Sequence, residues 1–224
     1  MPDTAAAAKE LIGGLATADV IDALAKTHPH RAHIIDLVSP DASKVLFGPA
    51  VTIGFMPVRQ DLMDPHRHSL GPAIYRAIGD ADPAGKVLVM ASGGNPAISL
   101  GGSTKLARVT NLNMAGVLCD GRLRDFEELA EFPGAFYCTG ETVRAGGNLI
   151  QPYVADVPID VAGVTVVPGD YIFADSTGAA VIPAAEVLQT LTMAHKILEM
   201  ARQMAATIAS EDPSSVLTDG SKEA

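Results

Sequence analysis

The sequence predicts an α/β fold in which parallel strands alternate with helices, followed by a β-rich segment and a long C-terminal helix. Two continuous apolar runs, at 86–91 and 114–119, are typical of strands that are buried on both faces of a sheet. A glycine-rich loop at 92–102 and a helix expected at 103–111 separate the two runs, which is the order of a βαβ unit. Near the C-terminus, apolar residues recur at steps of three or four from 183 to about 210, which predicts one long helix.

The N-terminal elements are predicted from local composition. The segment 5–26 is rich in Ala and Leu and is divided by two glycines at 13–14, which indicates two short helices. Thr17 is expected to be the capping residue of the second helix, because a threonine side chain can accept a hydrogen bond from the first turn. The β-branched and aromatic residues at 45–58, with interspersed Gly and Pro, then indicate a strand.

Short elements fill the rest of the chain. A helix is expected at 70–78, where Pro72 stands in the first turn, and another at 126–129. The later part of the chain alternates short apolar runs with turn residues, which is typical of tight hairpins. Short strands are therefore expected at 135–138, 158–161, 164–167, 170–174 and 179–182.

Composition and charge exclude several classes of protein. The chain has 224 residues, enough for one domain with a full core that needs no disulfide or metal. Its 48% hydrophobic and 19% charged residues exclude a wholly disordered chain. The 16 Lys and Arg against 26 Asp and Glu give a net charge of −10, which argues against a nucleic-acid partner. An aromatic content of 4% without Trp argues the same way.

The sequence also gives expectations about location and domain limits. The first residues lack the basic and apolar regions of a signal peptide, and no apolar run reaches the ~18 residues of a membrane helix. The two cysteines, Cys119 and Cys138, show no spacing typical of a zinc site or a disulfide framework. We therefore expect a cytoplasmic protein with no membrane partner. Residues 1–210 are expected to form a single domain, and the polar segment 211–224 is expected to be a disordered tail.

The dipeptide Arg124-Asp125 follows the second apolar strand and carries the strongest chemical signal. The planar guanidinium of an arginine matches a carboxylate with two hydrogen bonds, and an aspartate is a hard oxygen ligand for Mg²⁺ or Mn²⁺. Together they could hold a 2-oxo acid and draw electrons from its carbonyl group, which favours an enolate. The alternative is a surface ion pair in which Asp125 caps a helix that begins at Phe126.

The glycine-rich loop, which ends at Gly101, Gly102 and Ser103, is a second candidate feature. Glycines allow a ligand to approach the backbone, and amides at the start of a helix bind anions. An ordinary turn would explain the same residues. The loop lacks the spacing of a dinucleotide-binding fingerprint or a Walker loop, so the sequence gives no support for a nucleotide-dependent methyltransferase.

The polar stretch 61–68 contains the pair His66 and His68 beside two aspartates. Such a group could bind zinc, but a solvated loop or a loop that lines a substrate cleft is the simpler interpretation. Cys119 lies within an apolar strand and is interpreted as a small buried hydrophobic residue rather than as a nucleophile.

Several of these segments occur together in one order between Leu15 and Arg202. The most specific is Asp120-Gly-Arg-Leu-Arg-Asp125, which ends in the Arg-Asp dipeptide. The others are Thr17-Ala-Asp-Val-Ile-Asp-Ala-Leu24, Phe47-Gly-Pro-Ala-Val-Thr52, Gly93-Gly94, Val167-Pro-Gly-Asp170 and Ala174-Asp-Ser-Thr-Gly178. In this order the chain resembles the 4-hydroxy-4-methyl-2-oxoglutarate/4-carboxy-4-hydroxy-2-oxoadipate aldolases and the related regulators of ribonuclease E activity A.

The resemblance implies a swivelling β/β/α fold of the phosphohistidine-domain type, with flanking N-terminal helices and a long C-terminal helix. It also implies a homotrimer or a hexamer of two trimers, with active sites in clefts between subunits. In the family's pattern, Arg124 binds the carboxylate of a pyruvate unit, Asp125 ligates Mg²⁺ or Mn²⁺, and amides at 101–103 help to hold the substrate. The aldolases also decarboxylate oxaloacetate. The regulators generally lack the metal-binding aspartate, so Asp125 favours an enzyme.

One position departs from the family's pattern. The aldolases place an acidic residue twenty-one positions before the arginine, and here that position is Ser103. A serine carries no negative charge and is a poor general base unless it is activated. Glu199 of a neighbouring subunit is a candidate to replace this acid. Asp120, His66 and His68 are further candidates for the cleft.

The sequence therefore predicts a metal-dependent lyase that acts on a 2-oxo acid through a pyruvate-type enolate, as an aldolase, an oxaloacetate decarboxylase or both. Arg124 and Ser103 are the residues expected to take part in catalysis. Because of Ser103, three alternatives stay open: a hydratase or isomerase that uses the same enolate, a divergent biosynthetic enzyme on the same scaffold, and a non-catalytic oligomer that binds a ribonuclease or helicase.

Overall fold

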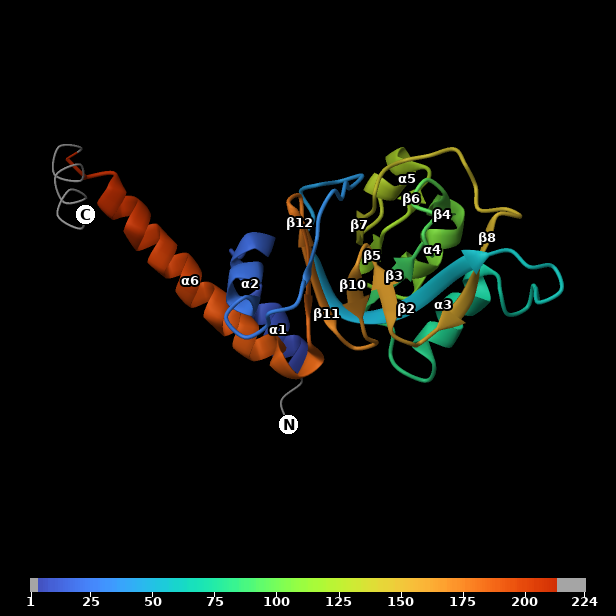
Figure 1. Ribbon diagram of the computed structural model, residues 1–224, viewed down its shortest axis with the longest axis horizontal. Coiled ribbons are helices and arrows are strands. Elements are labelled where there is room, and N and C mark those ends of the chain that lie inside the picture. The colour runs from blue at the N-terminus through green and yellow to red at the C-terminus, as the bar shows by residue number, and fades with distance from the viewer. Residues whose placement is uncertain (1–3, 213–224) are drawn as a thin grey trace.

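The computed structural model describes residues 4–212 and shows a mixed α/β body from which one long helix extends (Figure 1). Within these residues, eight strands form the main sheet; seven follow the order β1-β12-β11-β2-β3-β5-β7, and β8 pairs with β2. The strands are β1 (His33–Ile34), β2 (Leu46–Pro57), β3 (Val87–Ala91), β5 (Gly116–Cys119), β7 (Ala135–Tyr137), β8 (Ile150–Ala155), β11 (Tyr171–Asp175) and β12 (Gly178–Ile182). The long strand β2 joins the two parts of the sheet, because it pairs first with β11 and then with β3 and β8.

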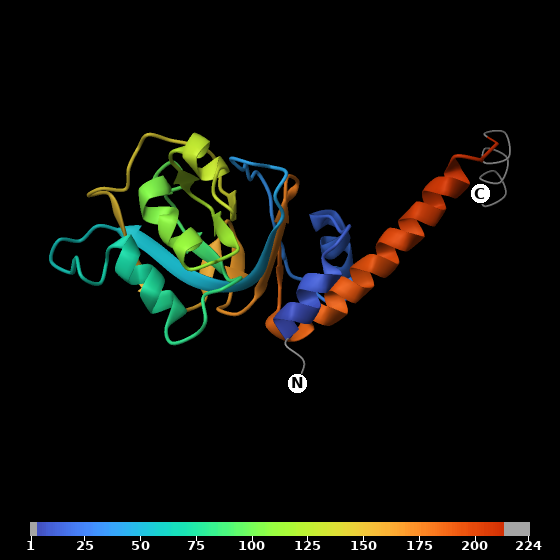
Figure 2. The ribbon, with the colours of Figure 1, turned by 180° about the vertical axis from the view of Figure 1, so that it is seen from behind.

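The parallel part of the sheet carries helices on one face. The pairs β2–β3, β3–β5 and β5–β7 are parallel. The helices α3 (Leu70–Ile78), α4 (Ser103–Asn111) and α5 (Phe126–Ala130) lie beside these strands (Figure 2). Leu88 and Met90 of β3 pack against this helical layer, whereas Val87 and Val89 point to the other face. The apolar run at 87–91 is continuous because both faces of its strand are buried.

A small hairpin covers the second face of the parallel strands. It consists of β9 (Ile159–Val161) and β10 (Val164–Val166), which pair antiparallel. Its alternate residues are buried against β3, and the residues between them face solvent. The hairpin therefore covers the face of the sheet that is opposite α3 and α4.

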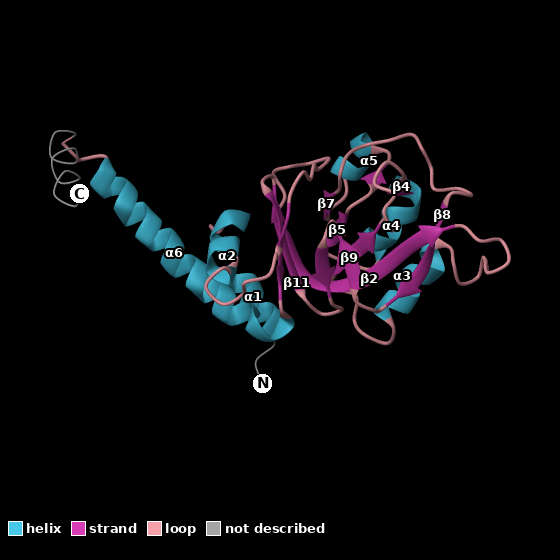
Figure 3. Cartoon of the chain, viewed as in Figure 1, coloured by secondary structure: helices cyan, strands magenta, loops and turns pink. Residues whose placement is uncertain are grey.

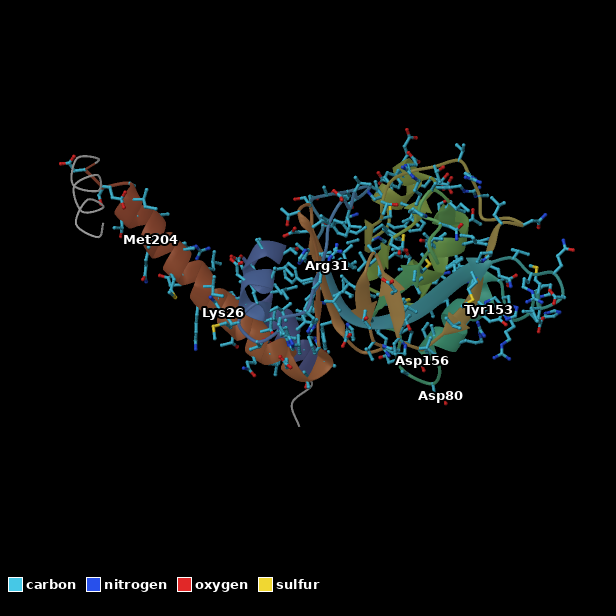
Figure 4. All side chains as sticks on the ribbon, in the orientation of Figure 1. Lys26, Arg31, Asp80, Tyr153, Asp156 and Met204 are labelled. Atoms are coloured by element: carbon cyan, nitrogen blue, oxygen red, sulfur yellow. The ribbon has the colours of Figure 1, made fainter. Side chains whose placement is uncertain are left out.

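Three helices form a third layer outside β11 and β12. They are α1 (Thr4–Leu11), α2 (Thr17–Leu24) and α6 (Val187–Ile208), and a 3₁₀ turn, η1 (Ala184–Glu186), precedes α6 (Figure 3). Leu191 and Ala194 in the first half of α6 are buried with residues of α1 and α2. The second half extends beyond these helices, and Met204, labelled near its end in Figure 4, is exposed.

Thr17 has a different role from the one expected. Ala16 occupies the capping position of α2, and Thr17 is the first helical residue. The Thr17 amide donates to Asp175 Oδ2 (2.8 Å), and its hydroxyl donates to the carbonyl oxygen of Gly178 (3.3 Å). The side chain thus ties α2 to the β11–β12 turn instead of capping its own helix.

The expected helices and the longer strands are confirmed, as is the mixed α/β class. Four strands were not predicted from the sequence: β1, β8, β4 (Ser99–Gly101) and β6 (Arg122–Leu123). Apart from residues 211 and 212, the expected tail lies outside the described residues. Among residues 4–212, no helix combines the length and the apolarity that crossing a membrane requires.

Candidate functional site

Two short parallel strands bring the two sequence motifs together. β4 and β6 pair so that Gly101 stands beside Leu123, and the Arg124 amide donates to the Gly101 carbonyl oxygen (3.0 Å). β4 leads directly into α4, and β6 leads into α5. The glycine loop and the dipeptide Arg124-Asp125 therefore lie next to each other at the carboxyl side of β5, where open α/β sheets bind ligands.

Asp125 contacts the start of α4. Its Oδ2 accepts a hydrogen bond from the Ser103 amide (3.0 Å) and another from Ser103 Oγ (3.1 Å). The carboxylate thus lies at the amino end of α4, where the partial positive charge of a helix stabilises it. Asp125 precedes α5 with a left-handed backbone (φ 64°) but makes no side-chain cap there. Asp125 therefore occupies the capping position of α5, as the alternative expected, but its side chain accepts hydrogen bonds from α4 and not from α5.

Gly102 allows these groups to approach. A Cβ atom at this position would lie 2.5 Å from Asp125 Oδ2 and 3.2 Å from Arg124 Nε. Any larger residue would therefore displace one of the two side chains. Arg124 is half-buried, and its guanidinium takes part in none of the ion pairs found within residues 4–212. It is thus free to receive a negatively charged group.

Arg124 lines a cleft of about 210 Å³. The backbone of Gly101 and Gly102 forms part of the same wall, and Lys105 from the first turn of α4 adds a second positive charge. No Asp or Glu of the described residues contributes to the lining, whose apolar part comes from Phe55, Met63, Leu70, Leu100 and Ile150. The cleft therefore has the size and the sign of charge for a small anionic molecule.

Gln151 on β8 is a cleft residue that the sequence analysis missed. It is 2% exposed, and neither Oε1 nor Nε2 of its side chain has a hydrogen-bond partner among the described residues. A buried amide without partners costs free energy, so a polar ligand group beside it would be stabilising. Gln151 precedes a proline in an edge strand, and no recognisable sequence motif marks it as a cleft residue. Lys105 was also not predicted, but its place in the first turn after Ser103 could have indicated it.

The two histidines of the polar stretch separate in the structure. His68 is buried, lines the cleft, and accepts a hydrogen bond at Nδ1 from the Asp64 amide (3.1 Å). His66 is exposed in the loop and does not belong to the described lining. Since no three His, Cys, Asp or Glu side chains are grouped anywhere in residues 4–212, this loop offers no closed zinc site.

Asp120 and Glu199 are not brought into this chain's cleft. Asp120 accepts hydrogen bonds from the amides of Ser92 (2.5 Å) and Ala162 (3.1 Å), so it joins the end of β3 to the β9–β10 turn. Glu199 is exposed on the part of α6 that extends away from the body (Figure 1) and accepts a hydrogen bond from Gln203 (3.0 Å). Cys119 is buried as expected, and burial raises the pKa of its thiol.

The donor set around Asp125 fits an ion that keeps much of its water shell. Mg²⁺ is commonly held by one or two carboxylates together with water and substrate oxygens. Asp125 offers one such carboxylate, and its Oδ1 accepts no hydrogen bond from any side chain or amide in the described part of the chain. The residues present therefore fit Mg²⁺ or Mn²⁺ better than an ion that needs several protein ligands.

Comparison with protein families matches residues 17–181 to the RraA-like family, described as Aldolase/RraA. The matched range includes the glycine segment 101–103 and the dipeptide Arg124-Asp125. The chain belongs to the RraA-like family.

The curated relatives include proteins named as aldolases and one protein whose name states no activity. A 4-hydroxy-4-methyl-2-oxoglutarate aldolase of Thermus thermophilus is 32% identical over 111 residues, which cover 50% of this chain and 67% of the relative. Protein DlpA of Legionella pneumophila is 30% identical over 140 residues, covering 62% of this chain but only 21% of DlpA. This chain thus corresponds to a minor part of DlpA.

A solved structure extends the likeness to nearly the whole chain. It is that of Streptomyces coelicolor RraAS2, described as an unusual member of the RNase ES inhibitor RraA protein family. The TM-score is 0.73 at 26% identity, and the match covers 88% of this chain and 96% of the neighbour. The RraA-like fold is therefore shared beyond the β4–β6 region that forms the site.

Proposed function

We propose that this RraA-like protein is a lyase that cleaves or forms a carbon–carbon bond next to a pyruvate unit of a 2-oxo acid. One observation carries the proposal: the half-buried Arg124 guanidinium, which forms no ion pair with any residue of 4–212, opens into a small cleft beside glycine backbone, with the Asp125 carboxylate adjacent. Names of relatives, among them the Thermus aldolase, support a lyase. In line with the sequence resemblance, we also propose the swivelling β/β/α fold, one domain over 1–210 and a trimeric or hexameric assembly.

In this proposal the side chains have separate roles. Arg124 binds the substrate carboxylate through two parallel hydrogen bonds, and Lys105 adds charge at the same wall. Gly101 and Gly102 keep side chains out of the space that the substrate occupies. Asp125 would hold Mg²⁺ or Mn²⁺, and such an ion, when bound, withdraws electrons from the 2-oxo group.

Proton transfer needs a group other than Ser103. The Ser103 hydroxyl donates to Asp125 Oδ2, so it positions the carboxylate and does not act as a base. His68 lines the cleft, and because its Nδ1 accepts from the Asp64 amide, its exchangeable proton is on Nε2. Among the cleft-lining side chains of residues 4–212, His68 is therefore the proposed acid or base, and Glu199 of another copy stays the alternative.

Substitution of Arg124 tests the proposal. Arg124→Ala should lower kcat/KM for pyruvate release from oxaloacetate or 4-hydroxy-4-methyl-2-oxoglutarate by about 100-fold or more, because charge-assisted binding of the carboxylate is lost. Arg124→Lys should recover part of the activity, since it keeps the charge without the planar fork. Arg31→Ala is the matched control, because Arg31 is exposed and, within residues 4–212, its side chain donates only to the His33 carbonyl oxygen. Equal activity of Arg124→Ala and the control would refute the proposal.

A regulatory binding protein is the second candidate. The likeness to RraAS2 and the uncharged Ser103 favour it. It predicts no release of pyruvate by the wild-type chain with any divalent ion, and partner binding that survives Arg124→Ala. Turnover by the wild-type chain that depends on Arg124 would exclude a purely non-catalytic role.

A further inference from the structure

A second cavity adjoins the Arg124 cleft, because His68 lines both. It has a volume of about 450 Å³ and lies between the ends of α3 and strand β8. Arg67 comes from the loop before α3, Arg76 from the last turn of α3, and Tyr153 from β8. Figure 4 labels Tyr153 at the end of the body opposite α6. This cavity is named the Arg67–Arg76 cavity below.

Arg76 is a partly buried charge without a partner. Its Nε and Nη2 atoms are buried, and no group in the described part of the chain accepts a hydrogen bond from them. Neither Arg76 nor Arg67 takes part in an ion pair among residues 4–212. Burial lowers the pKa of Arg76, and the neighbouring charge of Arg67 lowers it further. The carboxyl end of α3 offsets only part of the cost of such a charge.

The other polar groups of the cavity are donors as well. With Nδ1 of His68 occupied by the Asp64 amide, its Nε2 carries the proton, and the ring stacks on Tyr153 at 5.0 Å between centroids. The nearest aspartates along the loop are already engaged: Asp61 pairs with Arg59, and Asp64 accepts from the His66 amide. No Asp or Glu of the described chain lines the cavity.

We propose that the Arg67–Arg76 cavity binds a small oxyanion, the carboxylate or phosphate group of a small molecule. Two guanidiniums that are not neutralised by the protein match such a group with paired hydrogen bonds. Although the chain has a net charge of −10, these two neighbouring arginines without carboxylate partners make the cavity locally positive. The site uses none of the residues assigned to the reaction except the shared wall at His68, and it does not depend on the proposed activity.

Binding of inorganic phosphate is the direct test. Thermal unfolding and calorimetric titration are measured in phosphate and in chloride at equal ionic strength, without substrate or divalent ion. Phosphate at ten times its Kd should raise the Tm of the wild-type chain by roughly 3–5 °C. Arg76→Gln and the exposed Arg67→Gln should each abolish most of this rise. Arg108→Gln is the control, because Arg108 donates to the Lys105 carbonyl oxygen and does not line the cavity.

Two further ligands identify the source of the oxyanion. 2-Oxoglutarate carries a second carboxylate and 2-oxobutyrate does not. If the cavity receives the tail of a molecule whose 2-oxo acid end lies in the Arg124 cleft, Arg67→Gln weakens 2-oxoglutarate binding at least tenfold and leaves 2-oxobutyrate unchanged. If it receives a free anion, only phosphate binding is lost. Phosphate that fails to bind the wild-type chain, or that binds Arg76→Gln and Arg67→Gln as tightly as wild type, overturns the proposal.

Discussion

At the scale of single residues, Gly102 decides whether Arg124 and Asp125 can lie side by side. A Cβ here would be 2.5 Å from Asp125 Oδ2, so Gly102→Ala should move the carboxylate or the guanidinium without unfolding the body. A displacement of this size is expected to lower pyruvate release by about 10- to 100-fold. The measurement is steady-state kinetics beside a thermal melt.

The control for this substitution is Gly13→Ala, since an added Cβ at Gly13 would meet nothing within 4 Å. It should change neither turnover nor Tm noticeably. If Gly102→Ala were as active as Gly13→Ala, the close approach of Gly102 to the two side chains would have no part in function.

The candidate residues predicted from the sequence lie together in the structure, but their contacts were not predicted. Arg124, Asp125 and the segment 101–103 were chosen because of their chemistry, and the structure does bring them together. The hydrogen bonds from Ser103 to Asp125 were not foreseen, because they depend on the start of α4 facing the end of β6. The unpartnered Gln151 amide could not be predicted either, because the burial of a single polar side chain produces no repeating pattern in the sequence.

At the scale of elements, Asp175 connects β11 to α2 and to its own turn. Its Oδ2 accepts from the Thr17 amide (2.8 Å), and its Oδ1 accepts from the amide (2.8 Å) and hydroxyl (2.6 Å) of Thr177. Burial raises the pKa of Asp175, but these hydrogen bonds lower it more, so that the pKa in the folded protein lies below its ordinary value.

A depressed carboxylate pKa predicts a loss of stability in acid. The stabilisation by Asp175 is present above the pKa of the unfolded chain and is lost as pH falls through the lower pKa of the folded protein. Asp175→Asn should therefore lower the free energy of unfolding at pH 7 by about 1 kcal/mol, and the difference between the two proteins should shrink as the pH falls below the ordinary pKa of an aspartate. Urea unfolding over this range checks it, and a gap that stayed constant with pH would contradict the assignment.

Element prediction succeeded where a pattern was long enough to repeat. The apolar runs of β3 and β5 and the stripe of α6 were recognisable because they extend over several residues. β4 and β6 have only three and two residues, too few for a period of two to show. These are the strands that bring the motifs together, so the architecture of the site was less predictable than that of the core.

At the scale of the whole molecule, the long helix α6 points to an assembly. Its first half is buried against α1 and α2, but its second half exposes Met200 (67%), Met204 (59%) and Ile208 (55%). Apolar side chains repeated along one free helix are commonly covered in an oligomer. This observation supports the proposed homo-oligomer, and Glu199 on the same part of α6 would then lie near another copy.

The proposed function requires that Asp125 and Arg124 together perform ion-assisted chemistry on a 2-oxo acid. The most direct measurement is pyruvate release from oxaloacetate and from 4-hydroxy-4-methyl-2-oxoglutarate with and without Mg²⁺ or Mn²⁺. It compares the wild-type chain with Asp125→Asn, which keeps an oxygen to accept from Ser103 but is a poorer ligand. The matched control is Asp82→Asn, because Asp82 is exposed and, among the described residues, its side chain accepts only from the Ala84 amide (3.0 Å).

An enzyme-free reaction with the same ion gives the background. The wild-type chain and Asp82→Asn are expected to release pyruvate only when the ion is present, and release should fall by about 100-fold or more in Asp125→Asn. Release that persists after chelation, or that is equal in Asp125→Asn and the wild-type chain, would contradict the proposed role of Asp125.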